Sequence, residues 1–304
     1  MTTHLSSEPA SVSLLTTSQM RKEQWFLATL RRLVRNLSGI VGLLLVTFFL
    51  LTGVLGSLGI TPYPSVEQHP RDRLQAPSAK YLLGTDLFGR DLASRIMEGA
   101  GNSLQVALLS VAVSASVGII IGMIAGFTGG GIDTMLMRLM DVLFAFPALL
   151  LALIVITVRG PGLVNTALAI AIVYMPIFAR VARAPVLVAK ELDYVLAARC
   201  IGMKPAQLLI RHILPNVIAP LIVQISLALS WSLLTEAGLS FLGLGTPPPA
   251  ASWGLMLSES RGIAERAPWL MLYPGIAILL GVLGFNLLGD GLRDTLDPRL
   301  YKSK

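Results

Sequence analysis

Few residues in this chain could do chemistry, and their spacing does not suit a catalytic or metal site. The three histidines (His4, His69 and His212) are scattered and lack the H-E-x-x-H spacing of a zinc site. The single cysteine, Cys200, can form neither an internal disulfide nor a cysteine cluster for metal. No glycine precedes a lysine, which excludes the G-x-x-x-x-G-K-S/T phosphate-binding loop, and no G-x-S-x-G motif occurs. The sequence therefore predicts a non-catalytic chain.

The charged residues inside or beside apolar segments could instead form ion pairs. Asp141 lies three residues after Arg138, so the two side chains could pair on one helical face. A structural ion pair is the preferred interpretation, and a role in gating is the alternative. A second charged group follows the last apolar segment and is expected to brace that end of the chain: Asp290, Arg293, Asp294 and Asp297.

The elements that must position these residues are long and apolar. Hydrophobic residues make up 54% of the chain and charged residues 13%, a composition outside the range of soluble globular domains. A helix needs roughly 20 apolar residues to cross about 30 Å of hydrocarbon. The fold class predicted is an all-α integral membrane protein, and six segments are expected to span the membrane: 37–60, 104–127, 132–158, 164–180, 217–239 and 269–288.

The distribution of positive charge predicts the orientation of these spans. Most of the 24 Lys and Arg residues fall in segments that would lie on the same side as the N-terminus. By the positive-inside rule, both termini and the segment 191–215 should face the cytoplasm. The net charge of +7 is then a topology signal, because the clustered basic face with stacking aromatics that nucleic-acid binding needs is absent. The expected organisation is a cytoplasmic segment (1–36), an anchor helix (37–60), an external loop (61–103), a transmembrane core (104–290) and a cytoplasmic tail (291–304).

A polar segment between the fourth and fifth spans, residues 191–215, is the most distinctive part of the sequence, and we call it the knob. Apolar residues recur in it at helical spacing. Gly202 suits a left-handed cap after a first short helix, and Pro205 suits the first turn of a second one. Pro215 should end or kink that second helix. Two short amphipathic helices beside a bilayer indicate a docking element, although an ordinary surface segment would show the same periodicity.

Two segments on the predicted outer side, 61–100 and 243–268, are rich in proline, glycine and charge. The first contains a run of glycines and charged residues that we call the loop motif: Gly84, Asp86, Gly89, Arg90 and Asp91. Solvated loops are the preferred interpretation for most of these residues. The alternative is a pair of ordered caps over an external opening.

Taken in order, these elements resemble those of the inner-membrane permease subunits of bacterial ATP-binding-cassette (ABC) importers of the dipeptide, oligopeptide and nickel family, specifically the dipeptide-permease C-type subunit. The resemblance extends from about residue 37 to 300. The family signature E-A-A-x-x-x-G, with a later L-P, falls on six positions here: Leu196, Ala197, Ala198, Gly202, Leu214 and Pro215. Leu196 stands where the signature has glutamate.

The resemblance implies a type I ABC importer permease fold with six transmembrane helices in the bacterial cytoplasmic (inner) membrane. The knob would contain coupling helices, at 191–214, that dock on an ATPase, and Pro205 would belong to the same site as the signature residues. The implied partners are a homologous second permease, two ABC ATPases, an external substrate-binding protein and the lipid bilayer. No cofactor is expected on this chain, because ATP and Mg would bind the ATPases.

The resemblance also implies a cargo and places Glu236 near a path. Di- or oligopeptides are the expected cargo, with nickel or another small solute as the alternative within the family. An ion-coupled secondary carrier is the alternative from another class, although the sequence shows neither inverted repeats nor ion ligands at mid-membrane depth. Glu236, near the outer end of the fifth span, could meet the ammonium terminus of a peptide or reach into the headgroup region. Asp141 and Glu236 are thus candidate path or gate residues.

Overall fold

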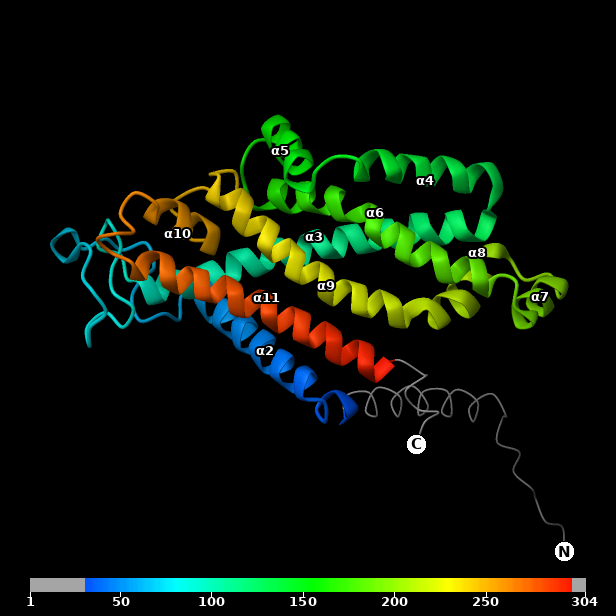
Figure 1. Ribbon diagram of the computed structural model, residues 1–304, viewed down its shortest axis with the longest axis horizontal. Helices are drawn as coiled ribbons and strands as arrows, with labels where there is room; N and C mark the ends of the chain where they lie inside the picture. The colour runs from blue at the N-terminus through cyan, green and yellow to red at the C-terminus, as the bar shows by residue number, and fades with distance from the viewer. Residues whose placement is uncertain (1–30, 297–304) are drawn as a thin grey trace, which may run out of the picture.

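The computed structural model describes residues 31–296, and they form an elongated bundle of helices (Figure 1). No β-strand is found within that range, apart from one isolated bridge between Thr85 and Asp91. The helices are α2 (Leu37–Ser57), α3 (Leu92–Thr128), α4 (Gly130–Phe144), α5 (Ala148–Arg159), α6 (Leu163–Ala189), α7 (Asp193–Cys200), α8 (Pro205–Leu208), α9 (Leu214–Phe241), α10 (Trp253–Ser260) and α11 (Trp269–Leu296), with a 3₁₀ turn at Pro70–Asp72 and a π turn at Leu209–Ile213. The predicted all-α fold is confirmed.

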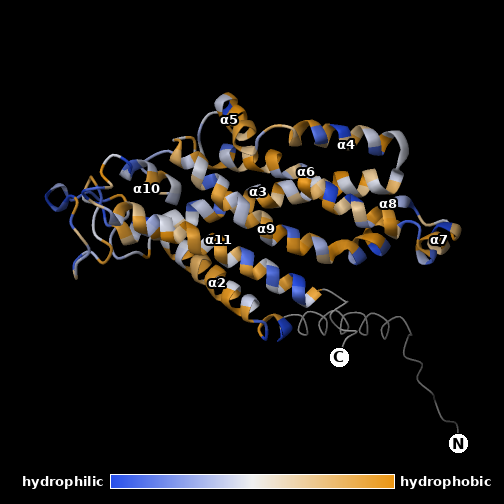
Figure 2. Cartoon of the chain, in the orientation of Figure 1, coloured by the Kyte–Doolittle hydropathy of each residue, from blue (hydrophilic) through white to orange (hydrophobic). Residues whose placement is uncertain are grey.

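The long helices run along the length of the bundle, and different segments lie at its two ends (Figure 1). At one end lie α10 and the segments that flank it, together with the chain between α2 and α3. We call this the loop end (residues 61–95 and 242–268). At the other lie α7 and α8, the two helices of the knob. Orange apolar residues cover much of the surface of the long helices between these ends (Figure 2), as a lipid-facing bundle requires.

Within the described residues, five helices are long and apolar enough to cross a membrane, and a sixth span would be the bent pair α4 and α5. The sequence predicted one span at 132–158, with a possible kink at Pro147, and the structure divides this segment into α4 and α5, which meet at an angle of 90°. Pro147 lies at the break with an extended ψ of 131°. A proline lacks the N–H that a helix needs and disfavours helical geometry in the residue before it, so the helix ends there.

Three other predicted boundaries shift because helices continue past the apolar stretch. Helix α3 begins at Leu92, so residues 92–103 of the expected external loop are helical. The fifth span is continuous with α8, from Pro205 to Phe241. Helix α11 runs to Leu296, so the predicted tail begins as helix. Residues 1–30 and 297–304, with the predicted Asp297, lie outside the described residues.

The close packing of α3 against α6 depends on small residues at four-residue spacing. Gly118, Gly122 and Gly126 lie along one face of α3. A methyl group at Gly122 would collide with the backbone carbonyl of Ala179 on α6, and one at Gly118 would lie 2.6 Å from the Met175 carbonyl. Such small-x-x-x-small faces let helix backbones approach each other in membranes. This pair forms the rigid centre of the bundle.

Candidate functional site

The knob is attached to the bundle by apolar side chains. Val195 and Ala198 of α7 are buried with Leu208 of α8 and Ile213. They pack in one cluster with Val186 of α6, so both short helices contact the end of the bundle. The charged residues of α7 also stabilise its dipole, because Asp193 lies in the first turn and Arg199 in the last. These contacts make the knob a rigid extension of the bundle.

The turn inside the knob has the geometry that its sequence predicts. Gly202 has φ +81°, in the left-handed region, and its N–H donates to the carbonyl of Arg199 at 3.0 Å. The next N–H, of Met203, donates to the carbonyl of Ala198 at 3.2 Å, which completes the cap. Nothing lies within 4 Å of a Cβ built at Gly202, so glycine is needed there for its backbone angle and not for space. Pro205 begins α8, as predicted.

Pro215 does not end the second helix, and this corrects one of the two predictions made for it. The chain passes from α8 through the π turn Leu209–Ile213 into α9, where Pro215 occupies the first turn. The N–H of Leu214 donates to the carbonyl of Leu209, five residues earlier. A proline ring crowds the preceding turn of a regular α-helix, and the wider π turn stands directly before this one. The knob is therefore joined to a membrane-crossing helix without a loop.

The signature residues divide between the attachment and the open surface of the knob. Ala198 is buried and Leu214 half-buried, whereas the other four are exposed: Leu196, Ala197, Gly202 and Pro215. Pro205, which belongs to the same predicted site, is exposed as well. Two other apolar side chains of the knob are more exposed than Leu196: Ile201, at 80% exposure, and Ile210. Helix α7 lies at the tip of the molecule, beyond the ends of the long helices (Figure 2). Contiguous exposed apolar residues mark interaction sites.

The loop motif is buried, and the expectation of a mostly solvated loop is wrong for it. Asp86 accepts hydrogen bonds from the backbone N–H groups of Phe88 and Arg90, at 2.8 and 2.9 Å. Its other oxygen accepts from Arg90 Nε at 2.5 Å. Asp91 caps α3 by accepting from the N–H and the hydroxyl of Ser94, at 2.9 and 2.6 Å. The motif is a tight turn that begins a helix.

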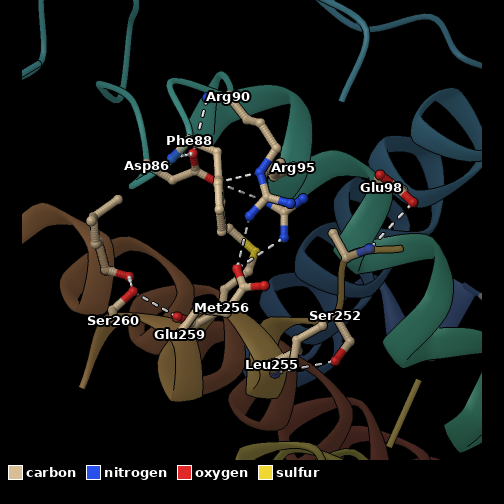
Figure 3. Close-up of polar contacts among 12 residues, drawn as sticks. Asp86, Phe88, Arg90, Arg95, Glu98, Ser252, Leu255, Met256, Glu259 and Ser260 are labelled. Carbon is tan, nitrogen blue, oxygen red and sulfur yellow. Dashed lines mark hydrogen bonds and ion pairs between the residues drawn. The ribbon is translucent and has the colours of Figure 1, made fainter. Parts of the chain in front are cut away.

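A charge network joins this turn to a distant helix (Figure 3). Glu259 of α10 accepts from Arg90 Nη2 at 3.1 Å and from Arg95 Nη2 at 3.2 Å. Arg95 is 1% exposed and also lies 3.6 Å from the Asp86 carboxylate. Two carboxylates thus balance two guanidinium groups in a largely buried place, where loss of one member leaves its partner unpaired. We call these four residues the loop-end network.

The glycines of the loop motif allow the turn to pack. Gly84 and Gly89 have φ +85° and +74°. A side chain at Gly89 would collide with the carbonyl of His69, and one at Gly84 would meet the Gln75 carbonyl at 2.5 Å.

Beside this turn, hydrogen bonds from Lys80 and Tyr81 hold the pKa of Asp72 below its ordinary value. The loop motif is a structural element of the loop end.

Glu236 is enclosed, which corrects both interpretations made for it. Its side chain is 1% exposed and accepts a hydrogen bond from the hydroxyl of Ser240 at 2.6 Å. It therefore reaches neither the headgroup region nor an open surface.

Asp141 pairs with a different arginine from the one predicted. Its carboxylate accepts from Arg180 Nη2 at 2.7 Å, and both side chains are exposed. The guanidinium of Arg180 also lies 4.3 Å from the centre of the Phe144 ring. Arg138 was the predicted partner, but α4 packs along α6, and this brings Arg180 to Asp141 across the helix interface. A second pair, Arg183 with Asp133, joins the same two helices at 2.6 Å.

The C-terminal charges lie on α11. Asp294 accepts from the amide of Asn36 at 2.9 Å, and Asn36 in turn caps α2. This contact joins the start of α2 to the end of α11. Asp290 and Arg293 are exposed on the same helix.

The sequence did not indicate that Arg95 and Glu259 meet, and it did not single out the glycine face of α3. The glycines at 118, 122 and 126 carry a recognisable four-residue signal. Glu259 lies 164 residues from Arg95, and nothing local in either segment indicates that the two side chains meet.

The sequence and the fold are both similar to those of known proteins. Residues 118–302 match the family described as binding-protein-dependent transport system inner membrane component. Over 270 residues the chain is 45% identical to the dipeptide transport system permease protein DppC of Alkalihalophilus pseudofirmus, covering 89% of this chain and 88% of that protein. It is 45% identical over 242 residues to the glutathione transport system permease protein GsiD of Pectobacterium atrosepticum, covering 79% and 80%. The fold is similar to that in an inward-facing structure of the MetNI methionine ABC transporter, with a TM-score of 0.55 and 17% identity over 66% of this chain and 95% of that chain.

Proposed function

The chain belongs to the family of inner membrane components of binding-protein-dependent transport systems, and on that premise we propose that it forms half of a path for di- and oligopeptides. It is a non-catalytic, multi-pass permease subunit of an ABC importer in the inner membrane, and such an importer works with ATPase and substrate-binding components. Relatives named for dipeptide and glutathione transport support a peptide cargo. Family membership favours ATP-driven import over the ion-coupled carrier.

The proposed assembly contains a homologous second permease, two ABC ATPases and one external binding protein. ATP and Mg²⁺ would bind the ATPases. The knob would face the cytoplasm and seat on an ATPase, and the loop end would face outward toward the binding protein. The distribution of Lys and Arg in the sequence supports this orientation.

The observation that carries the proposal is the knob. Its attachment is apolar and tight, its tip exposes apolar side chains, and it continues without a loop into α9. Movement of an ATPase that holds the tip would therefore be transmitted to a membrane-crossing helix. In this role Leu196, Ala197 and Gly202 form the contact surface, Ala198 anchors α7, and Pro205 begins the second coupling helix. Leu214 and Pro215 join it to α9.

Gly202→Pro tests the proposal because proline cannot adopt φ +81° and has no N–H to donate to Arg199. Gly59→Pro is the matched control, since Gly59 also has a positive φ of +72°, donates to the Gly56 carbonyl at 3.1 Å and has open space around it. We expect both variants to insert in the membrane. Gly202→Pro should abolish ATP-dependent peptide uptake and release the ATPases during purification, whereas Gly59→Pro should retain both.

Normal uptake by Gly202→Pro would contradict the coupling role of the knob. Uptake of nickel but of no peptide by the wild-type importer would leave the coupling role intact and overturn the cargo.

A further inference from the structure

A small aromatic pocket opens on the face where α4, α5, α6 and α9 meet. Its volume is about 220 Å³, and its lining includes Phe144 and Phe146 from the α4–α5 bend, Tyr174 and Ile177 from α6, and Trp231 from α9. The 90° bend leaves both phenylalanines exposed at its corner, and Trp231 is 61% exposed. A hydrogen bond of 2.8 Å between the hydroxyls of Tyr174 and Thr235 fixes one wall.

The ion pair Asp141–Arg180 lies at the edge of this pocket. Arg180 stacks on Phe144, which is one of the pocket residues, and both members of the pair are exposed. Ionisable residues on membrane-crossing helices face a water-filled cavity or a protein partner, because exposure to lipid is costly. This face of the bundle therefore does not face lipid at the level of the pair.

We propose that the pocket is a contact site for peptide side chains on the translocation path, a deepening that rests on the proposed function. A large apolar or aromatic side chain would lie among Phe144, Phe146 and Trp231. The ammonium and carboxylate ends of a short peptide would pass Asp141 and Arg180, which carry the complementary charges. The volume is below that of an ordinary small-molecule site, so the pocket holds one side chain and binds it weakly. Weak contacts suit a path that the cargo must also leave.

A second permease seated directly on the pocket is the competing occupant. Such a contact would bury the Asp141–Arg180 pair, and removing two charges from water costs several kcal/mol per ion. A water-filled path beside the pocket leaves the pair solvated. The exposed charges favour the peptide as the occupant.

The experiment uses the intact importer in vesicles, with its binding protein, ATP and a dipeptide that carries a photoreactive leucine analogue. Adducts are expected on residues 144–151 or on Trp231. Trp231→Ala should slow the uptake of a phenylalanine-containing dipeptide by roughly fivefold more than that of dialanine, because an aromatic contact is lost. Leu279→Ala is the control: Leu279 of α11 is 64% exposed and lies outside the pocket, so it should change neither rate. The same binding protein serves every variant, so a changed preference must come from this chain.

Adducts confined to other segments, or equal slowing of both peptides by Trp231→Ala, would overturn the proposal. Loss of the second permease from the purified Trp231→Ala complex would also overturn it and assign the pocket to subunit contact. Absence of any peptide uptake by the wild-type importer is a separate result, because it would overturn the proposed function itself.

Discussion

The two ends of the bundle are held together by different forces. The knob is attached by buried apolar side chains such as Val195 and Ile213, and its tip is exposed. The loop end is held by buried charges that join Asp86, Arg90 and Arg95 to Glu259. Apolar attachment allows one surface to stay open to a partner, whereas a charge network fixes two distant segments in a single arrangement. The difference indicates a docking element at one end and a locked cap at the other.

The largest effect on stability is expected at the loop end. Glu259→Gln removes one of two negative charges from the network and leaves Arg95 without its closest carboxylate partner. We expect a loss of about 2–3 kcal/mol in the free energy of unfolding, because two largely buried guanidinium groups are then balanced by the single carboxylate of Asp86. Unfolding by SDS titration in mixed micelles measures this loss.

Glu265→Gln provides the control for that measurement, since Glu265 is exposed on the same loop end and should tolerate the change. Equal stability of the two variants would show that the charge network does not hold the loop end together. The proposed difference between the loop end and the knob would then be wrong.

At the knob, a surface change should weaken association and leave stability unchanged. Ile201→Asp places a charge on the exposed tip of the knob. The free energy of unfolding should stay within about 0.5 kcal/mol of wild type. Affinity for the ATPase should fall roughly tenfold, as for an apolar contact residue of moderate importance. Titration of the detergent-solubilised permease with purified ATPase gives the dissociation constant, and an unchanged value would exclude the tip from the interface.

The smallest effect concerns pH at the loop end. Lys80 and Tyr81 lower the pKa of Asp72, so its contribution to stability is present above the ordinary aspartate pKa of about 4 and is lost as the pH falls through the lowered value. The stability difference between wild type and Asp72→Asn should therefore be larger at pH 7 than at pH 3. A difference that is independent of pH would show that the ionised Asp72 does not stabilise this loop.

Local signals in the sequence predicted the knob well. Gly202 and Pro205 specify a cap and a helix start through their own backbone restrictions, so their neighbours are enough to place them. Asp91 and Ser94 carry a comparable local signal for the start of α3, but hydropathy placed the span later because the first turns of this helix lie at the loop end.

Contacts between distant segments could not be predicted in the same way. The partner of Asp141 lies 39 residues away on α6, and that of Arg95 lies 164 residues away on α10. Nothing in the sequence around Glu236 indicates that its side chain is buried, because the burial depends on distant segments of the chain. Pro147 can end or kink a helix, but nothing near it in the sequence specifies the 90° angle between α4 and α5.

The most direct test of the central claim uses the one cysteine of the chain. Cys200 is exposed on α7, beside the signature residues. Labelling it in membranes with a maleimide that carries a photoreactive group should give adducts with the ATPase, in a yield that changes when ATP is added. In a Cys200→Ser background, Glu265→Cys moves the same probe to the loop end and should give none. Efficient labelling of Cys200 without any ATPase adduct would contradict the coupling role of the knob.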